Sequence, residues 1–108
     1  VEGHEGRLIF GDVKGVPVLA LQGRIHAYEG HPMEDIVLPV RAMGLAGIEI
    51  LITTNASGGI NEKWSPGDLA IIDDHINLSG RNPLVGPNMA ELGPRFPDMT
   101  KAYDPEIS

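Results

Sequence analysis

Residues 16–30, VPVLALQGRIHAYEG, decide how this chain is expected to fold and where its chemistry is expected to lie. The first part is a nearly unbroken apolar run, which predicts a buried β-strand. A cation, an imidazole, a phenol and a carboxylate follow between Gly23 and Gly30. In open α/β sheets, ligands bind beyond the carboxyl ends of the strands. The stretch therefore predicts a strand that leads into a binding site, although by itself it also fits an ordinary solvated loop.

A second polar cluster follows the next apolar segment. Residues 48–54 are short, apolar and β-branched, which predicts another strand, and residues 53–59 read TTNASGG. The glycine pair allows a sharp turn and lets backbone N–H groups approach an anion. The cluster is neither a P-loop nor a dinucleotide fingerprint, and by itself it is more typical of a plain strand-to-loop turn. We expect both clusters on loops that leave the same edge of the sheet.

The hairpin and helix signals lie on either side of the first cluster. Residues 7–12 and 16–21, joined by a Lys-Gly turn, predict a β-hairpin. A proline followed by two acidic residues predicts a helix over about 32–47, which Pro39 should kink. Together with the apolar strands, these signals predict an α/β fold, with a mixed, twisted β-sheet flanked by helices.

The second half of the chain carries weaker signals. Residues 69–73 predict a strand that extends to about residue 77, after a Ser-Pro-Gly-Asp turn. Residues 78–102 are rich in Pro, Gly and Asn and predict a long irregular segment, which in a compact domain is usually functional or an interface. Residues 104–106, Asp-Pro-Glu, have the pattern of a helix start.

Composition excludes several classes of function. Fifteen acidic residues against eight basic ones give a net charge of −7, which argues against a nucleic-acid partner. The absence of cysteine excludes disulfides, thiolate metal sites and a cysteine nucleophile within these residues. No apolar run reaches the roughly 20 residues of a membrane span, and no signal-peptide pattern is present. We therefore expect a cytoplasmic protein without a membrane partner.

The histidines are candidates for metal binding or catalysis. The four histidines show no pair at the spacing of helical metal ligands, so no metal site is expected (His4, His26, His31 and His75). A lone histidine is more often structural than catalytic. His26 differs because Arg24 and Glu29 flank it. The arginine fork can bind an anion with two parallel hydrogen bonds, and Glu29 is placed to orient the imidazole.

Ordered motifs along the chain resemble those of the trimeric purine nucleoside phosphorylases. These are GRIHAYEG at 23–30, TNASGG at 54–59 and DHINL at 74–78, extended by GHEGRL at 3–8, NPLVGPN at 82–88, RFP at 95–97 and AYD at 102–104. The resemblance covers essentially the whole chain. Members of that family are more than twice as long. The resemblance thus implies that residues 1–108 are part of a single α/β phosphorylase domain, truncated at both ends.

The resemblance implies reversible phosphorolysis of purine ribonucleosides or deoxyribonucleosides. Inorganic phosphate, a co-substrate, attacks the anomeric carbon and releases the free purine and an α-pentose 1-phosphate. The chemistry implies no cofactor and no metal, and the family is homotrimeric. Binding, positioning and electrostatics would dominate such a reaction. The residues that select the purine base would lie after residue 108.

Site residues follow from the resemblance by motif position. The phosphate contacts it implies are His4, Arg24, His26 and the backbone N–H of Ala56. His26 and Glu29 are the implied catalytic pair, in which Glu29 orients His26. On the nucleoside side, the resemblance implies Tyr28 as a ribose contact, Asn55 as a residue that shapes the loop, and Phe96 as a residue that covers the ribose of a neighbouring subunit. Ser57 departs from the alanine that is usual in the family, which is a small change.

Other interpretations stay open at this point. A methylthioadenosine phosphorylase is disfavoured, because the Arg-x-His-x-Tyr-Glu-Gly pattern is not typical of that enzyme. A xanthosine-preferring enzyme fits the same motifs. From another class, the chain could be a non-catalytic phosphate- or nucleoside-binding module. Phosphate-dependent release of a purine would distinguish an enzyme from such a module.

Overall fold

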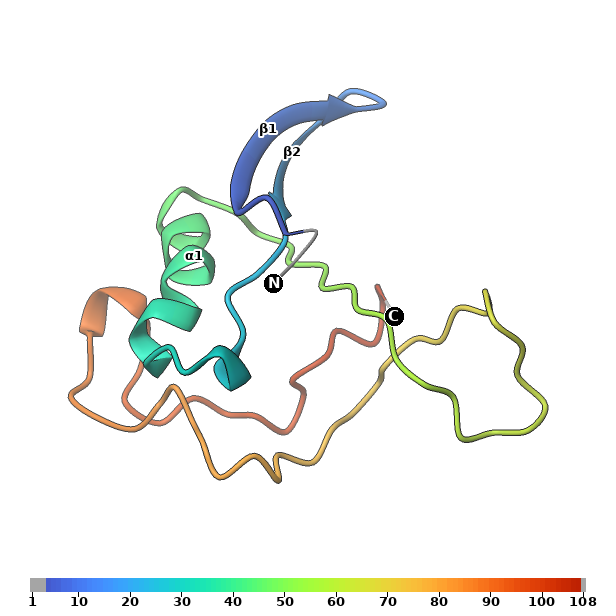
Figure 1. The fold of residues 1–108 in the computed structure, drawn as a ribbon. Helices are drawn as coiled ribbons and strands as arrows, with labels where there is room; N and C mark the ends of the chain where they lie inside the picture. The colour runs from blue at the N-terminus through green and yellow to red at the C-terminus, as the bar shows by residue number, and fades with distance from the viewer. Residues whose placement is uncertain (1–3, 108) are drawn as a thin grey trace.

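The computed structural model describes residues 4–107, so Gly3 of the GHEGRL motif lies outside the described residues. Strands β1 (Arg7–Val13) and β2 (Val16–Gln22) form a hairpin that stands apart from the rest of the chain (Figure 1). Below it lie the 3-10 turn η1 (Ala27–Glu29), helix α1 (Met33–Leu45) and a second 3-10 turn, η2 (Ala90–Leu92). Long irregular segments follow α1 and surround η2.

The hairpin forms because its turn residues suit a two-residue loop. β1 and β2 are antiparallel, with Arg7 opposite Gln22 and Val13 opposite Val16. Lys14 and Gly15 both have positive φ, at 55° and 85°, as the twist-compatible hairpin turns require. The Asp12 carboxylate also accepts a hydrogen bond from the Gly15 N–H at 2.7 Å. These features confirm the predicted hairpin, but the expected burial of residues 16–21 is wrong, because every residue of β2 is exposed or half-buried where nothing within residues 4–107 packs over the hairpin.

Helix α1 begins and ends with recognisable signals. Pro32 precedes it, and Glu34 and Asp35 lie in the first turn. Acidic side chains at this end stabilise a helix through their interaction with the helix dipole. At its end, Gly47 has φ of 91°, and its N–H donates to the Gly44 carbonyl. The next N–H, of Ile48, donates back to the Met43 carbonyl at 3.2 Å. This is a Schellman ending, and the predicted helix is confirmed with Pro39 inside it.

The strands predicted at 48–54 and 69–77 are not formed. Figure 1 draws residues 48–54 as an extended trace without an adjacent strand, and the sheet within residues 4–107 consists of β1 and β2. A strand needs a neighbour to bond its N–H and C=O groups, and neither segment has one in this part of the chain. Residues 105–107 form a turn, and Asp104 Oδ1 accepts a hydrogen bond from the Glu106 N–H at 2.8 Å, as the N-cap of the expected helix start would.

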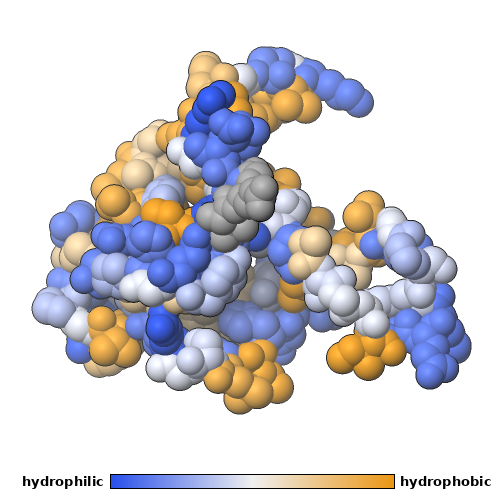
Figure 2. Space-filling view, viewed as in Figure 1, coloured by the Kyte–Doolittle hydropathy of each residue, from blue (hydrophilic) through white to orange (hydrophobic). Residues whose placement is uncertain are grey.

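Very little of the apolar surface is covered. Met43, 7% exposed, is the buried hydrophobic residue of the described chain. The accessible surface is 9789 Å², against about 5,800 Å² expected for a compact monomer of this mass. The radius of gyration is 15.9 Å, whereas about 13 Å is expected. Figure 2 shows hydrophobic residues scattered over the visible face. This arrangement is consistent with part of an α/β domain.

Candidate functional site

The polar loop after β2 is shaped by its own carboxylate. Glu29 lies in η1 and reaches back to His26, whose backbone N–H donates to Glu29 Oε2 at 2.8 Å. The same oxygen lies 3.2 Å from Nδ1 of the His26 ring. The turn is closed by the Glu29 N–H, which donates to the His26 carbonyl, and Gly30 follows in the left-handed conformation. The sequence thus places a carboxylate where it can fix the plane and tautomer of an imidazole.

Electrostatics in this turn favour the ionised form of Glu29. The hydrogen bond from the His26 N–H is the principal cause that holds the pKa of Glu29 well below the ordinary value of 4.5. A bond to the His26 side chain acts in the same direction. Glu29 is therefore a carboxylate at neutral pH and accepts hydrogen bonds only.

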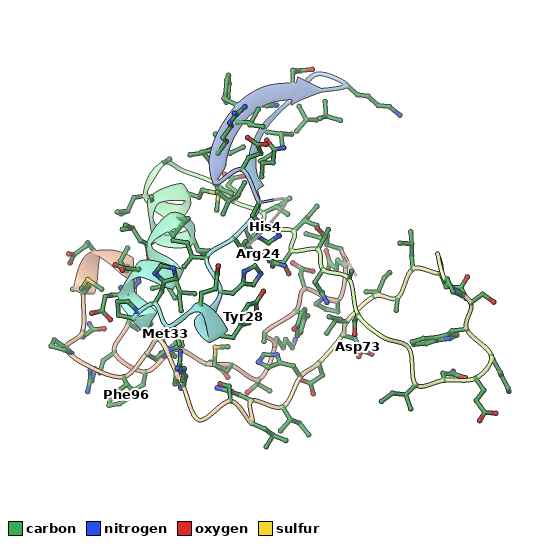
Figure 3. All side chains as sticks on the ribbon, viewed as in Figure 1. His4, Arg24, Tyr28, Met33, Asp73 and Phe96 are labelled. Carbon is green, nitrogen blue, oxygen red and sulfur yellow. The ribbon has the colours of Figure 1, made fainter. Side chains whose placement is uncertain are left out.

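Three rings from two parts of the chain are stacked. The His4 and His26 rings lie 4.9 Å apart between centroids, with planes inclined by 27°. The Tyr28 ring lies at the same distance from His26, inclined by 21°. Figure 3 shows His4, Arg24 and Tyr28 gathered near the middle of the molecule. The rings follow in the order His4, His26 and Tyr28. The two imidazoles therefore lie beside the arginine, and the phenol forms one end of the stack.

Gly23 makes this stack possible. A Cβ at position 23 would lie 2.6 Å from Cβ of His4, closer than real side chains approach. Gly23 also has φ of 89°, in the left-handed region that favours glycine. His4 Nδ1 in turn lies 3.3 Å from the Arg24 carbonyl. Reasoning from sequence identified the flanking glycines but missed this close approach, for which the only signal was the glycine itself.

Arg24 joins the two polar clusters. Its Nη2 donates to the Thr54 carbonyl at 2.6 Å, across thirty residues of sequence. This bond brings the two clusters together, but residues 48–54 do not form the strand expected before the second cluster, so a shared sheet edge for both loops stays a prediction. Thr54, which reasoning from sequence gave no role, directly precedes Asn55 and Ala56. Within residues 4–107 the Ala56 N–H has no hydrogen-bond acceptor, so it is available to an anion.

A hollow lies beside these groups. His4, Arg24 and Glu29 line an open cavity of about 290 Å³ together with apolar residues of β2 and α1. A larger hollow of about 440 Å³ lies between α1 and residues 83–95, and no predicted site residue lines it. The smaller hollow is thus lined by two of the four predicted phosphate contacts, His4 and Arg24, whereas His26 and Ala56 are not in its lining. No group of three potential metal ligands occurs within the described residues.

Phe96 is not part of this cluster. Its side chain is 85% exposed and is drawn away from Tyr28 in Figure 3. Arg95 lies over its ring, with Cζ 5.6 Å from the centroid. Tyr28 is likewise 76% exposed. Both rings are thus open to contact with another molecule or another segment, and the role predicted for Phe96 stays a prediction.

Comparison with known proteins places this arrangement in a family. The model of the Phosphorylase superfamily matches residues 1–108. The chain belongs to the Phosphorylase superfamily. Within this superfamily it is similar to purine nucleoside phosphorylase 1 of Bacillus subtilis, with 56% identity over 108 residues that cover 100% of this chain and 40% of that protein. It is 49% identical to the purine nucleoside phosphorylase of Bos taurus, over 99% of this chain and 38% of that protein.

Solved structures agree with the sequence comparison. A purine nucleoside phosphorylase in complex with ribose-1-phosphate matches with a TM-score of 0.89 and 46% identity, over 99% of this chain and 41% of that chain. A schistosoma purine nucleoside phosphorylase in complex with hypoxanthine matches with a TM-score of 0.85 and 46% identity, over 93% of this chain and 37% of that chain. The predicted α/β fold class is confirmed by these matches.

The superfamily member described here spans about 40% of the length of the curated relatives it matches. The exposed apolar surface and the segments without a partner strand are what part of a larger domain would show. A separate finding concerns membranes: no helix in the described residues is long and apolar enough to cross one.

Proposed function

We propose that the full-length protein carrying these residues is a phosphorylase that cleaves purine nucleosides reversibly with inorganic phosphate. The observation that carries the proposal is the hydrogen bond between Arg24 and the Thr54 carbonyl, which joins the two polar clusters beside the stacked rings. Similarity to purine nucleoside phosphorylases over the whole of this chain supports the reaction class. On this proposal residues 1–108 form part of a single larger α/β domain in a cytoplasmic enzyme.

Phosphate is the ligand that suits the first half of this site. Because the Thr54 carbonyl holds one N–H of Arg24, the guanidinium is fixed before an anion arrives, and its other N–H groups remain to bind one. The Ala56 N–H, His26 and His4 would supply further contacts to phosphate oxygens. Glu29 would keep the His26 ring in place through its 3.2 Å contact. A preorganised set of donors of this kind binds an anion without reorganisation.

The nucleoside would lie on the Tyr28 side of the ring stack. In the proposed reaction a phosphate oxygen forms a bond to the anomeric carbon while the bond from that carbon to the purine nitrogen breaks. The electron pair of the broken bond leaves with the purine. No side chain acts as a nucleophile, so holding phosphate and sugar in line supplies the rate enhancement. Asn55, next to the Thr54 carbonyl, would shape the loop on this side.

The test measures release of hypoxanthine from inosine by the full-length protein, with and without phosphate. We expect release only with phosphate. Arg24→Ala should raise the phosphate KM about 10- to 100-fold, because a charged hydrogen-bond donor to the anion is lost. Arg24→Lys keeps the positive charge but not the forked guanidinium, so its phosphate KM should lie between those of wild type and Arg24→Ala. Release that is independent of phosphate, or an Arg24→Ala variant with normal phosphate dependence, would contradict the proposal.

We further propose that the enzyme is a homotrimer in which Phe96 acts on a neighbouring subunit. The exposed Phe96 ring lies in an irregular segment and makes no ring contact with Tyr28 in its own chain among the described residues. Large exposed aromatic side chains of this kind are frequent at protein interfaces. Phe96 of one subunit would then cover the sugar held against Tyr28 of another and exclude water from it.

Mixed oligomers test this arrangement. Phe96→Ala and Arg24→Ala subunits are each expected to be weakly active alone. If sites are shared, hybrid trimers contain one site that lacks neither residue, and activity partly returns on mixing. Mixtures of Arg24→Ala with His26→Ala serve as the matched control, because both residues lie in the same subunit's site and no recovery is expected. Absence of recovery in proven Phe96→Ala hybrids would show that Phe96 serves its own subunit.

A further inference from the structure

The turn formed by residues 77–81 is fixed by its own side chains. Asn77 Oδ1 accepts hydrogen bonds from the Ser79 hydroxyl at 2.7 Å and from the Ser79 N–H at 3.0 Å. Asn77 Nδ2 donates to the Arg81 carbonyl at 2.8 Å, and the Arg81 N–H donates to Ser79 Oγ at 3.2 Å. Such local bonds order a loop without any sheet or helix. The backbone of Arg81 is therefore held in place although it belongs to no regular element.

From this turn, Arg81 reaches the candidate site. Its Nη1 donates to the Ala27 carbonyl at 2.9 Å, across 54 residues of sequence. Ala27 is the first residue of η1, and the same carbonyl accepts the Gly30 N–H at 3.3 Å. A hydrogen bond from a guanidinium is stronger than one between neutral groups. Arg81 thus clamps the turn that carries Tyr28.

η1 needs an external support of this kind. It is a single 3-10 turn, a form with poor hydrogen-bond geometry that is stable only in short pieces. Tyr28, in its middle, is 76% exposed, and among the described residues its ring stacks on that of His26. A small movement of the turn would therefore move the Tyr28 ring relative to His26.

Arg41 in α1 and Arg95 after η2 also donate to backbone carbonyls, but not to those of η1. Arg41 donates to the Pro83 carbonyl at 3.4 Å, and Arg95 donates to the Gly86 carbonyl at 2.6 Å. Both of these carbonyls precede η2 in the chain and lie outside the site loop. Sequence reasoning missed Arg81 because a bond to a backbone carbonyl leaves no signal at the accepting residue.

We propose that Arg81 is a positioning residue for the nucleoside side of the site: it holds η1 so that Tyr28 stays stacked on His26. The inference rests on the proposed phosphorolysis for its kinetic consequence. Its structural consequence, the position of Tyr28, rests on the hydrogen bond from Arg81 to the Ala27 carbonyl alone. Since Arg81 contacts the turn and not the anion-binding groups, nucleoside binding depends on it more than phosphate binding does.

The kinetic test uses the full-length protein with Arg81→Ala, Arg81→Lys and Arg81→Gln. We expect Arg81→Ala to raise the nucleoside KM about five- to twentyfold, as for loss of a charged hydrogen bond, and to change the phosphate KM less than about twofold. Arg81→Lys should restore part of the lost affinity, because it can still donate to the Ala27 carbonyl. Arg41→Ala is the matched control and should leave both KM values unchanged.

A spectroscopic test detects the position of the Tyr28 ring without an activity measurement. In protein labelled at histidine, the ring resonances of His26 should shift in Arg81→Ala, because stacking against Tyr28 is lost, and should return toward wild type in Arg81→Lys. Tyr28→Leu gives the reference spectrum for a His26 without its phenol. Unchanged His26 resonances in Arg81→Ala, or equal increases of both KM values, would overturn the inference. A wild-type protein without phosphorolysis would defeat the proposed function instead, and the His26 resonances alone would then decide the role of Arg81.

Discussion

Residues 4–47 and residues 48–107 differ sharply in how their backbone groups are bonded. The first region contains the β1–β2 hairpin and α1, with a bonded turn and a bonded helix end. The second contains η2 and isolated turns, and it exposes apolar side chains almost completely, such as Ile60 at 98% and Leu69 at 99%. Hairpins and helices satisfy their hydrogen bonds within one short segment, whereas a lone central strand cannot. The difference shows which elements need the remainder of a domain.

The largest expected effect comes from studying the 108 residues alone. Their apolar faces stay exposed, so we expect no phosphorolysis and little cooperative unfolding. Amide hydrogen exchange should be slower in β1, β2 and α1 than anywhere in residues 48–107. In the full-length protein, the amides of 48–54 and 69–73 should become protected, because partner strands would then be present. Equal protection of both regions in the isolated chain, or measurable phosphorolysis, would remove the contrast.

A smaller effect is expected from the glycines at the ends of the site loop. Gly23→Ala should both strain the backbone by roughly 1–2 kcal/mol and displace His4, because its Cβ would meet His4 at 2.6 Å. Gly30→Ala is a matched control, since Gly30 has the same φ of 89° with open space around it. Both variants should lower the free energy of unfolding of the full-length protein, and only Gly23→Ala should also raise the phosphate KM, by several-fold. An equal effect on KM would show that backbone strain alone matters.

The smallest effect concerns pH. The folded pKa of Glu29 is depressed, so its contribution to stability is present above the ordinary pKa of 4.5 and is lost as pH falls toward the folded value. Urea unfolding of wild type and Glu29→Gln should therefore differ most at neutral pH and converge gradually as the pH falls from 4.5 toward the depressed folded pKa. Glu91→Gln, at an exposed carboxylate of η2, is the comparison. A difference between wild type and Glu29→Gln that does not change with pH would mean that the Glu29 charge plays no part.

Sequence reasoning succeeded where the signal was local. The Lys14-Gly15 turn and the signals at both ends of α1 predicted the hairpin and the helix to within a few residues. It failed for 48–54 and 69–77 because an apolar, β-branched segment shows only that a strand is favoured when a neighbour exists. The site residues around Gly23–Gly30 were predicted as a group, and the structure brings His4, Arg24, His26, Tyr28 and Glu29 together. Their chemical roles stay predictions.

By itself, the sequence determined the hairpin, the helix, the two polar clusters and the resemblance to a phosphorylase family, because these depend on the order of residues along short stretches. Only the tertiary structure decided that Arg24 meets the Thr54 carbonyl, that His4 stacks on His26 over Gly23, and that Arg81 reaches Ala27. Each of these contacts joins groups that are distant in sequence, and two of them end on a backbone carbonyl. Every residue carries such a carbonyl, so the identity of the partner is set by the path of the chain and not by the residue type.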